Sequence, residues 1–121
     1  MTIHTEVVIP RGAEALFRSL SDPSRLAIIT CLVHGEHRVT DLMSEVGLSQ
    51  STVSEHVSCL KDCGLVQGRH EGRQIFYSLA HEEVLTLLDA ASNVLAATGY
   101  AVDECPTYGR TARVAARREG A

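Results

Sequence analysis

The sequence predicts a mainly α-helical fold with one small β-hairpin (α+β), in the order ααααββα. Apolar residues recur at helical spacing in five segments, and two short β-prone runs flank a charged turn between the fourth and fifth segments. With 121 residues and 45% hydrophobic content, the chain is the size of one compact domain. No apolar run approaches the roughly 18 residues of a membrane helix, and no signal peptide is recognisable. We therefore expect a cytoplasmic protein without a membrane span.

The first two helices are expected to meet at a proline-containing junction. Apolar spacing predicts one helix over residues 12–20 and a second, buried helix over residues 25–33. Between them, Asp22 can cap the second helix, with Pro23 at its first position.

The next two helices are expected to form a helix-turn-helix unit. Residues 39–46 predict a short helix, with Thr40 or its neighbour near the cap and Gly47 as a left-handed stop. Ser49 is a suitable N-cap for a further helix over residues 50–63. The turn between these two helices is short and contains glycine.

A hairpin and a long fifth helix complete the predicted domain. Residues 65–70 and 74–79 are β-prone and are separated by the charged turn 71–73. Apolar spacing then predicts a helix over residues 82–97. Its apolar surface exceeds what the shorter helices can cover, which suggests a partner chain. We assign no firm structure to the residues that follow.

The fourth helix has two different faces. Val53, Val57 and Leu60 lie on one stripe and are expected to pack inward. The other side carries one amide, small hydroxyls and one cation, on Gln50, Ser51, Ser54, Ser58 and Lys61. Such a face suits a DNA groove, because glutamine can bond bidentately to adenine and small side chains allow close approach. The alternative is a polar face that is merely solvated.

The order of these elements is that of a winged helix, in which the second helix of the unit enters the major groove and the hairpin contacts the backbone. The stretches LSDPSRLAIITCL, VTDLMSEVGLSQSTVSEHVSCLKDCGLV and EGRQIFYSL resemble the ArsR/SmtB family of dimeric metal-responsive repressors, over roughly residues 12–97. The resemblance implies a winged helix-turn-helix homodimer that binds double-stranded operator DNA.

The resemblance also assigns residues and regions. It places Gln50, Ser51, Thr52, Ser54 and His56 in the recognition helix, and Arg69 and Arg73 in the wing. His56 lies beside the inward stripe, so a half-buried histidine is an alternative to a base contact. The expected regions are an N-terminal arm (1–11), a DNA-binding and dimerisation domain (12–98) and a C-terminal tail (99–121) that carries a metal ligand.

Two thiols lie one turn apart on the fourth helix. On a helical wheel Cys59 and Cys63 are about 40° apart, beside the core stripe and away from the serine face. The spacing i, i+4 lets two thiolates bind one ion, but tight capture of a soft ion needs at least one more ligand. Cys105 is the remaining candidate, because Cys31 falls within the buried pattern of the second helix.

The resemblance further indicates which sensing site to expect. The family's cysteine-rich motif, of the form ELCVCDL, appears here as Glu36–Leu42 without either cysteine, and no histidine follows Asp89 to form the zinc-type site on the fifth helix. Cys59, Cys63 and Cys105 instead match the cadmium- and lead-sensing CmtR-type branch, in which the tail ligand comes from the other subunit. Cadmium or lead is the expected effector, with arsenite and zinc as alternatives, because three thiolates suit large soft ions.

Other functions stay open at this level. The same cysteines could form a redox- or persulfide-sensing switch on the same fold. A net charge of −4 also suits a winged-helix protein-interaction module that never reads DNA. An enzyme is the least favoured interpretation, because Cys63 and His56 lie on one helix without oxyanion donors or a third group.

Overall fold

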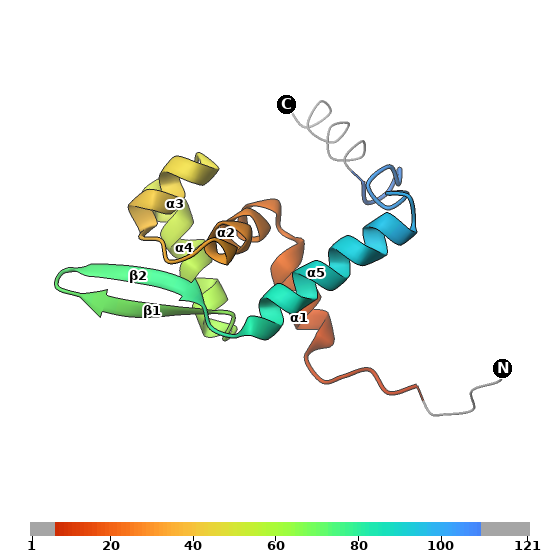
Figure 1. Cartoon of the computed structure of the whole chain (residues 1–121), viewed down its shortest axis with the longest axis horizontal. Coiled ribbons are helices and arrows are strands. Elements are labelled where there is room, and N and C mark those ends of the chain that lie inside the picture. The colour runs from red at the N-terminus through yellow and green to blue at the C-terminus, as the bar shows by residue number, and fades with distance from the viewer. Residues whose placement is uncertain (1–6, 110–121) are drawn as a thin grey trace. The chain divides into compact units, whose positions relative to one another are not determined.

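The computed structural model describes residues 7–109, which form two compact units that divide between His81 and Glu82. The outer parts of the predicted arm and tail lie outside the described residues. The first unit contains α1 (Ala13–Ser21), α2 (Pro23–Val33), α3 (Val39–Val46), α4 (Gln50–Asp62), β1 (Val66–Glu71) and β2 (Gln74–Leu79), and the second contains α5 (Glu82–Ala97) (Figure 1). This order confirms the predicted fold class.

The bounds of α3, β2 and α5 are those expected from the sequence, and the other elements differ from the expected bounds by one or two residues. The junction between α1 and α2 is also as predicted. Asp22 is the N-cap of α2, Pro23 occupies the first position, and the Asp22 carboxylate accepts a hydrogen bond from the backbone N–H of Arg25 at 2.9 Å. A proline there costs no hydrogen bond, because the first N–H groups of a helix have no intrahelical partner.

The N-cap of α3 is Arg38, so Thr40 lies near the cap, as expected, but does not form it. The backbone N–H of Arg38 donates to Oδ2 of Asp41 at 2.8 Å, so the carboxylate three residues along decides where the helix begins. At the other end Gly47 has φ 70°, a left-handed conformation that stops the helix. Ser49 then caps α4 by accepting a hydrogen bond from the N–H of Thr52.

The core of the first unit consists mainly of aliphatic side chains from α2, α3 and α4, with Leu20 of α1 and Val66 of β1 also buried. The largest fully buried side chains are Ile28, Ile29, Leu42, Val53, Val57 and Leu60. α2 contacts α1, α3, α4 and β2, and is therefore the central element. The predicted inward stripe of α4 is confirmed, because all three of its residues belong to this core.

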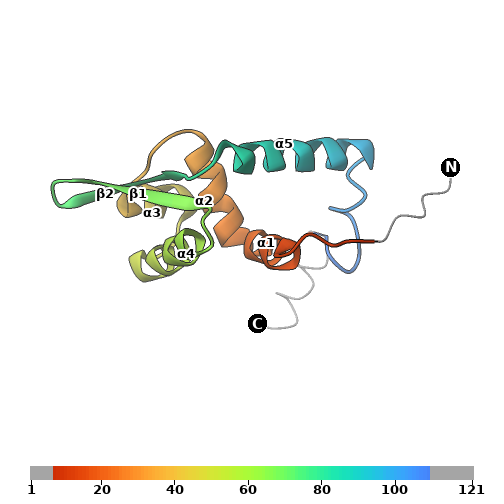
Figure 2. The ribbon, with the colours of Figure 1, turned by 90° about the horizontal axis from the view of Figure 1, so that it is seen from below.

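The wing is an antiparallel hairpin that pairs Val66 with Leu79 at its base and Glu71 with Gln74 at its tip. In both Figure 1 and Figure 2 the hairpin projects beyond the helices of the first unit. An isolated bridge anchors it: the N–H of His37 donates to the carbonyl of Tyr77 at 3.0 Å, and the N–H of Tyr77 donates to the carbonyl of His37 at 2.8 Å. The loop between α2 and α3 is therefore joined to the hairpin by backbone hydrogen bonds.

The second unit consists of α5 and a series of turns up to Gly109. Leu85 is 39% exposed and Val94 is 59% exposed, so α5 presents apolar side chains. Among the helices of the described residues, none is long and apolar enough to cross a membrane.

Candidate nucleic-acid interface and thiol cluster

The outer face of α4 carries the side chains predicted to contact DNA. Gln50, Ser51, Ser54, Ser58 and Lys61 are all exposed, whereas Thr52 is half-buried at the first turn. Thr52 takes part in the cap, since its Oγ1 accepts a hydrogen bond from Ser49 at 2.9 Å. The helix therefore presents short polar groups on a rigid support, an arrangement that allows close approach to base edges.

His56 lies between α4 and the start of α2. Its side chain is 19% exposed, and its Nε2 lies 3.9 Å from Oδ2 of Asp22, the same carboxylate that caps α2. This geometry agrees with the half-buried alternative. A base contact by His56 stays a prediction.

Glu55 is a polar residue of α4 that the sequence interpretation left out. It is exposed between Ser51 and Ser58 on the outer face. Its position on a helical wheel already places this carboxylate on the same face as the hydroxyl and amide groups. A carboxylate on this face can accept a hydrogen bond from the amino group of cytosine.

Arg69, one of the two predicted wing contacts, is held by other side chains of the first unit. Its guanidinium donates two hydrogen bonds to Glu36, each 3.0 Å long, and one to Glu71 at 2.8 Å. It also lies 5.0 Å from the ring centroid of Phe76. The hydrogen bonds from Arg69 lower the pKa of Glu36 and raise the pKa of Arg69 itself. Arg69 thus joins the wing to the α2–α3 loop, and its contact with DNA stays a prediction.

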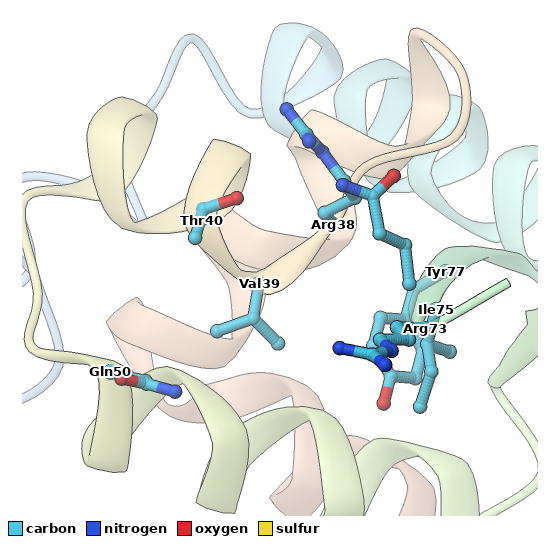
Figure 3. Close-up of a pocket in the computed structure, with 8 residues that line it drawn as sticks. Arg38, Val39, Thr40, Gln50, Arg73, Ile75 and Tyr77 are labelled. Atoms are coloured by element: carbon cyan, nitrogen blue, oxygen red, sulfur yellow. The ribbon is translucent and has the colours of Figure 1, made fainter. Parts of the chain in front are cut away.

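Arg73, the other wing residue, lines a pocket of about 410 Å³ between α3, α4 and the wing. The pocket is also lined by Val39 and Thr40 of α3, Gln50 of α4, and Ile75 and Tyr77 of β2. In Figure 3 the Arg73 guanidinium and the Gln50 amide point into the pocket from opposite sides, while the guanidinium of Arg38 points away. Arg73 and Gln50 lie on separate elements in the sequence, and the tertiary fold brings them to one cavity.

Cys59 and Cys63 are both exposed at the C-terminal end of α4, where Cys63 is the C-cap. Partial burial, the charge of Cys59 and a hydrogen bond with Cys59 raise the pKa of Cys63, and the positive charge of Arg25 acts in the opposite direction. The two thiols therefore interact directly, as their spacing predicted. A soft cation between them would replace their protons, because thiolates rather than thiols ligate metals.

Cys31 differs from these thiols in its environment. Burial, followed by a hydrogen bond with Glu45 and the charge of that carboxylate, raises the pKa of Cys31 to about 11. Formation of the Cys31 thiolate, the form that ligates metals, is therefore disfavoured. This agrees with the exclusion of Cys31 from the predicted ligand set.

Cys105 lies in the second unit, in the turns that follow α5. Hydrogen bonds from the backbone N–H groups of Tyr108 and Thr107 lower the pKa of Cys105, and partial burial opposes this effect. Backbone N–H groups in a turn stabilise an anion. They therefore favour the thiolate form of Cys105.

No group of three or more His, Cys, Asp or Glu side chains that could hold a metal ion occurs within residues 7–109. The thiols are nevertheless the type of ligand that a soft metal ion prefers. Cys59 and Cys63 provide two neighbouring sulfur atoms, and Cys105 provides a stabilised thiolate. Cys59 and Cys63 belong to the first unit and Cys105 to the second.

Comparison with known sequences identifies similar regulators. The pattern described as "Bacterial regulatory protein, arsR family" matches residues 22–67. The chain is 35% identical to the probable mercury resistance operon repressor of Streptomyces lividans over 96 residues, which cover 79% of this chain and 77% of that protein. It is 40% identical to the HTH-type transcriptional regulator CmtR of Mycobacterium tuberculosis over 82 residues, or 68% of this chain and 70% of that regulator.

Solved structures give the same result for the fold. The crystal structure of Rv0081 from Mycobacterium tuberculosis matches with a TM-score of 0.70 and 32% identity, covering 75% of this chain and 94% of that one. The homodimeric winged helix-turn-helix DNA-binding domain of Mb0332 from Mycobacterium bovis matches with a TM-score of 0.61 and 29% identity, covering 74% and 89%. These likenesses confirm the winged helix-turn-helix fold.

Proposed function

Because this chain belongs to the arsR family of bacterial regulatory proteins, which are DNA-binding transcriptional regulators, we propose that it is a homodimeric repressor that leaves its operator when a soft metal ion binds Cys59, Cys63 and Cys105. Cadmium or lead is the proposed effector, with arsenite and zinc as alternatives. The named relatives support a metal effector in general, since one is a mercury resistance operon repressor by name.

The observation that carries this proposal is the pair of interacting, exposed thiols on α4. Cys59 and Cys63 lie on the helix whose outer face carries the predicted base contacts, at the end opposite Gln50. An ion held there acts on the DNA-reading element itself. Both thiols are accessible, and each contributes a soft sulfur ligand.

Cys105 would complete the ligand set from the second unit of the same chain or of the partner. Binding of the three sulfurs to one ion would tie α4 to the segment that follows α5. Operator binding requires the two recognition helices of a dimer at a fixed spacing, about 34 Å for adjacent major grooves. A link that shifts either α4 therefore weakens DNA binding, and by reciprocity DNA weakens metal binding.

The test is a cadmium titration of the reduced protein, with ultraviolet thiolate-to-metal charge transfer and fluorescence anisotropy of a bound duplex read in the same sample. The duplex is selected from random-sequence DNA with the metal-free protein. We expect one ion per protomer and a loss of DNA affinity of roughly 5- to 150-fold, the usual range of allosteric coupling. Cys105→Ser should weaken both the absorption band and the loss of affinity.

Cys31→Ser is the matched control, because it removes a cysteine of α2 that lies outside the proposed ligand set. It should behave as the wild type in both readouts. Stoichiometric metal binding without a change in DNA affinity would contradict the proposal. Parallel titrations with lead, arsenite and zinc decide among the effectors.

A thiol redox switch is the second candidate, favoured by the direct interaction of Cys59 with Cys63 and by the lowered pKa of Cys105. Two thiols would lose two protons and two electrons to a peroxide or polysulfide and form a disulfide or a persulfide-derived bridge. Release of DNA by such an oxidant, with no cadmium absorption band, would establish this switch in place of the metal site.

A protein-interaction module is the alternative of another class. If the double variant Gln50→Ala, Ser54→Ala leaves DNA binding unchanged, α4 does not read DNA and this module is favoured.

A further inference from the structure

We propose that the pocket between α3, α4 and the wing seats one sugar–phosphate unit of the operator backbone, with Arg73 and Thr40 binding the phosphate and Val39 and Ile75 packing against the deoxyribose. This inference rests on the DNA-binding half of the proposed function and not on metal sensing. It extends the predicted interface, which had included neither the start of α3 nor the inner side of β2.

The lining of the pocket is amphipathic. Val39, Ile75 and Tyr77 are half-buried and form an apolar wall, whereas Thr40, Gln50 and Arg73 are exposed at its rim. A DNA backbone alternates in the same way between an apolar sugar ring and an anionic phosphate. The volume of about 410 Å³ leaves room for such a unit.

The charge of the lining points to an anion. None of the side chains that line the pocket is acidic, although the chain as a whole has a net charge of −4. Arg38, at the edge, is paired with Asp41 at 3.0 Å and directs its guanidinium away from the pocket. The guanidinium of Arg73 has no ion-pair or hydrogen-bond partner within residues 7–109 and points into the pocket. An exposed arginine of this kind contributes to phosphate binding.

The position of the pocket favours backbone DNA over a free anion. Gln50, the first residue of α4, lines one side, so the pocket adjoins the end of the helix that approaches the base edges. Thr40 lies in the first turn of α3, the helix that crosses the backbone in this motif. A duplex read by α4 would therefore bring a phosphate next to Thr40 and Arg73. The hairpin and α3 keep their spacing through the bridge between His37 and Tyr77.

The test uses the reduced, metal-free protein and a duplex selected from random-sequence DNA. Affinity is measured by anisotropy over a series of NaCl concentrations for the wild type, Arg73→Gln and Thr40→Val. Each phosphate contact contributes about 0.9 to the slope of log affinity against log salt. Arg73→Gln should therefore reduce the slope by about 2 per dimer. Thr40→Val keeps the side-chain shape but removes the hydroxyl, and should weaken binding without a comparable change in slope.

A matched control separates this contact from the general effect of charge. Arg18→Gln removes one exposed positive charge on α1, whose partner is Glu14, and should leave the slope close to that of the wild type. Duplexes with one neutral methylphosphonate at each backbone position then locate the contact. At one position per half-site the substitution should weaken binding to the wild type and to Arg18→Gln, but not weaken Arg73→Gln further.

Three results would overturn the inference. The first is an Arg73→Gln variant that keeps the wild-type salt slope and is weakened like the wild type by a methylphosphonate at every position. The second is binding of inorganic phosphate to the DNA-free wild type but not to Arg73→Gln, with equal salt slopes of DNA affinity for the two proteins. This result would identify a free-anion site. A wild type that selects no duplex would remove the DNA-binding half of the proposed function as well, whereas loss of the cadmium response alone leaves this inference intact.

Discussion

Asp41 determines the start of α3 through two partners on Arg38. Its carboxylate accepts hydrogen bonds from the Arg38 side chain, at 3.0 Å to each oxygen, and from the Arg38 backbone N–H at 2.8 Å. These hydrogen bonds lower the pKa of Asp41 from 3.8 to about 2. The bonds from the Arg38 side chain have the larger effect. The same ion pair holds the Arg38 guanidinium away from the interior of the pocket, so a local cap also shapes the surface proposed to face DNA.

A group whose pKa is lowered by folding contributes stability above its ordinary pKa and loses that contribution as the pH falls toward the lowered value. Asp41→Asn should therefore be less stable than the wild type at pH 7. The difference should shrink as the pH falls through the window from 3.8 to about 2. Urea unfolding followed by circular dichroism at a series of pH values measures it. Glu14→Gln, which removes an exposed ion pair, should change stability little, and a pH-independent gap for Asp41→Asn would refute the argument.

At the scale of elements, α4 combines three tasks on different sides of one helix. Val53, Val57 and Leu60 anchor it in the core, the polar face is exposed, and Cys59 and Cys63 interact near its C-terminal end. Because the anchor is rigid aliphatic packing, a force applied at the thiols is transmitted to the whole helix rather than absorbed locally. This rigidity would be the physical basis for the proposed coupling of metal binding to DNA release.

Leu60→Ala tests how much the core anchor of α4 contributes. Leu60 is fully buried, and truncation of such a residue costs about 2–5 kcal/mol of the free energy of unfolding. Ser58→Ala, two residues away and exposed, should change stability by less than about 0.5 kcal/mol. Urea midpoints of the two variants provide the comparison. Equal stability of both would mean that α4 is not held by its apolar stripe.

The wing shows how an element acquires its position from distant residues. Glu36 lies 33 positions before Arg69 and accepts two of its hydrogen bonds, and His37 bridges to Tyr77. Two-stranded hairpins are marginal on their own. The ion pair and the bridge therefore hold the wing at the place where Arg73 completes the pocket with Gln50.

At the scale of the whole molecule, the chain consists of a winged helix-turn-helix unit and a second unit with exposed apolar residues on α5. Exposed apolar side chains on an amphipathic helix commonly mark a protein–protein interface. The proposed homodimer would bury them and thereby set the spacing of the two α4 helices.

Val94→Glu tests the dimer directly. Val94 is 59% exposed, so the new carboxylate is tolerated in a monomer but is expensive to bury in an interface. We expect a shift from dimer to monomer in analytical ultracentrifugation, with an unchanged helical signal in circular dichroism and a loss of DNA affinity. Ser92→Glu, an exposed site about 200° around the helix from Val94, is the control and should stay dimeric. A dimeric Val94→Glu would place the interface elsewhere.

Local chemistry in the sequence was sufficient for the fold. Apolar spacing, Asp22 before Pro23, Ser49 as a cap and Gly47 as a stop act over a few residues, and each is present in the structure where it was expected. The interacting pair Cys59 and Cys63 was equally accessible, because an i, i+4 spacing on a helix brings side chains together regardless of the rest of the fold.

Tertiary structure decided the features that join distant segments. The pairing of Arg69 with Glu36, the high pKa of Cys31 beside Glu45, and the cavity shared by Arg73 and Gln50 all depend on how helices and hairpin pack. Helical and strand periodicities report which face of an element is apolar, but not which element lies against it. The sequence by itself therefore determined the winged helix and its pair of thiols, and packing alone determined which wing arginine is held within the protein and which points into the pocket.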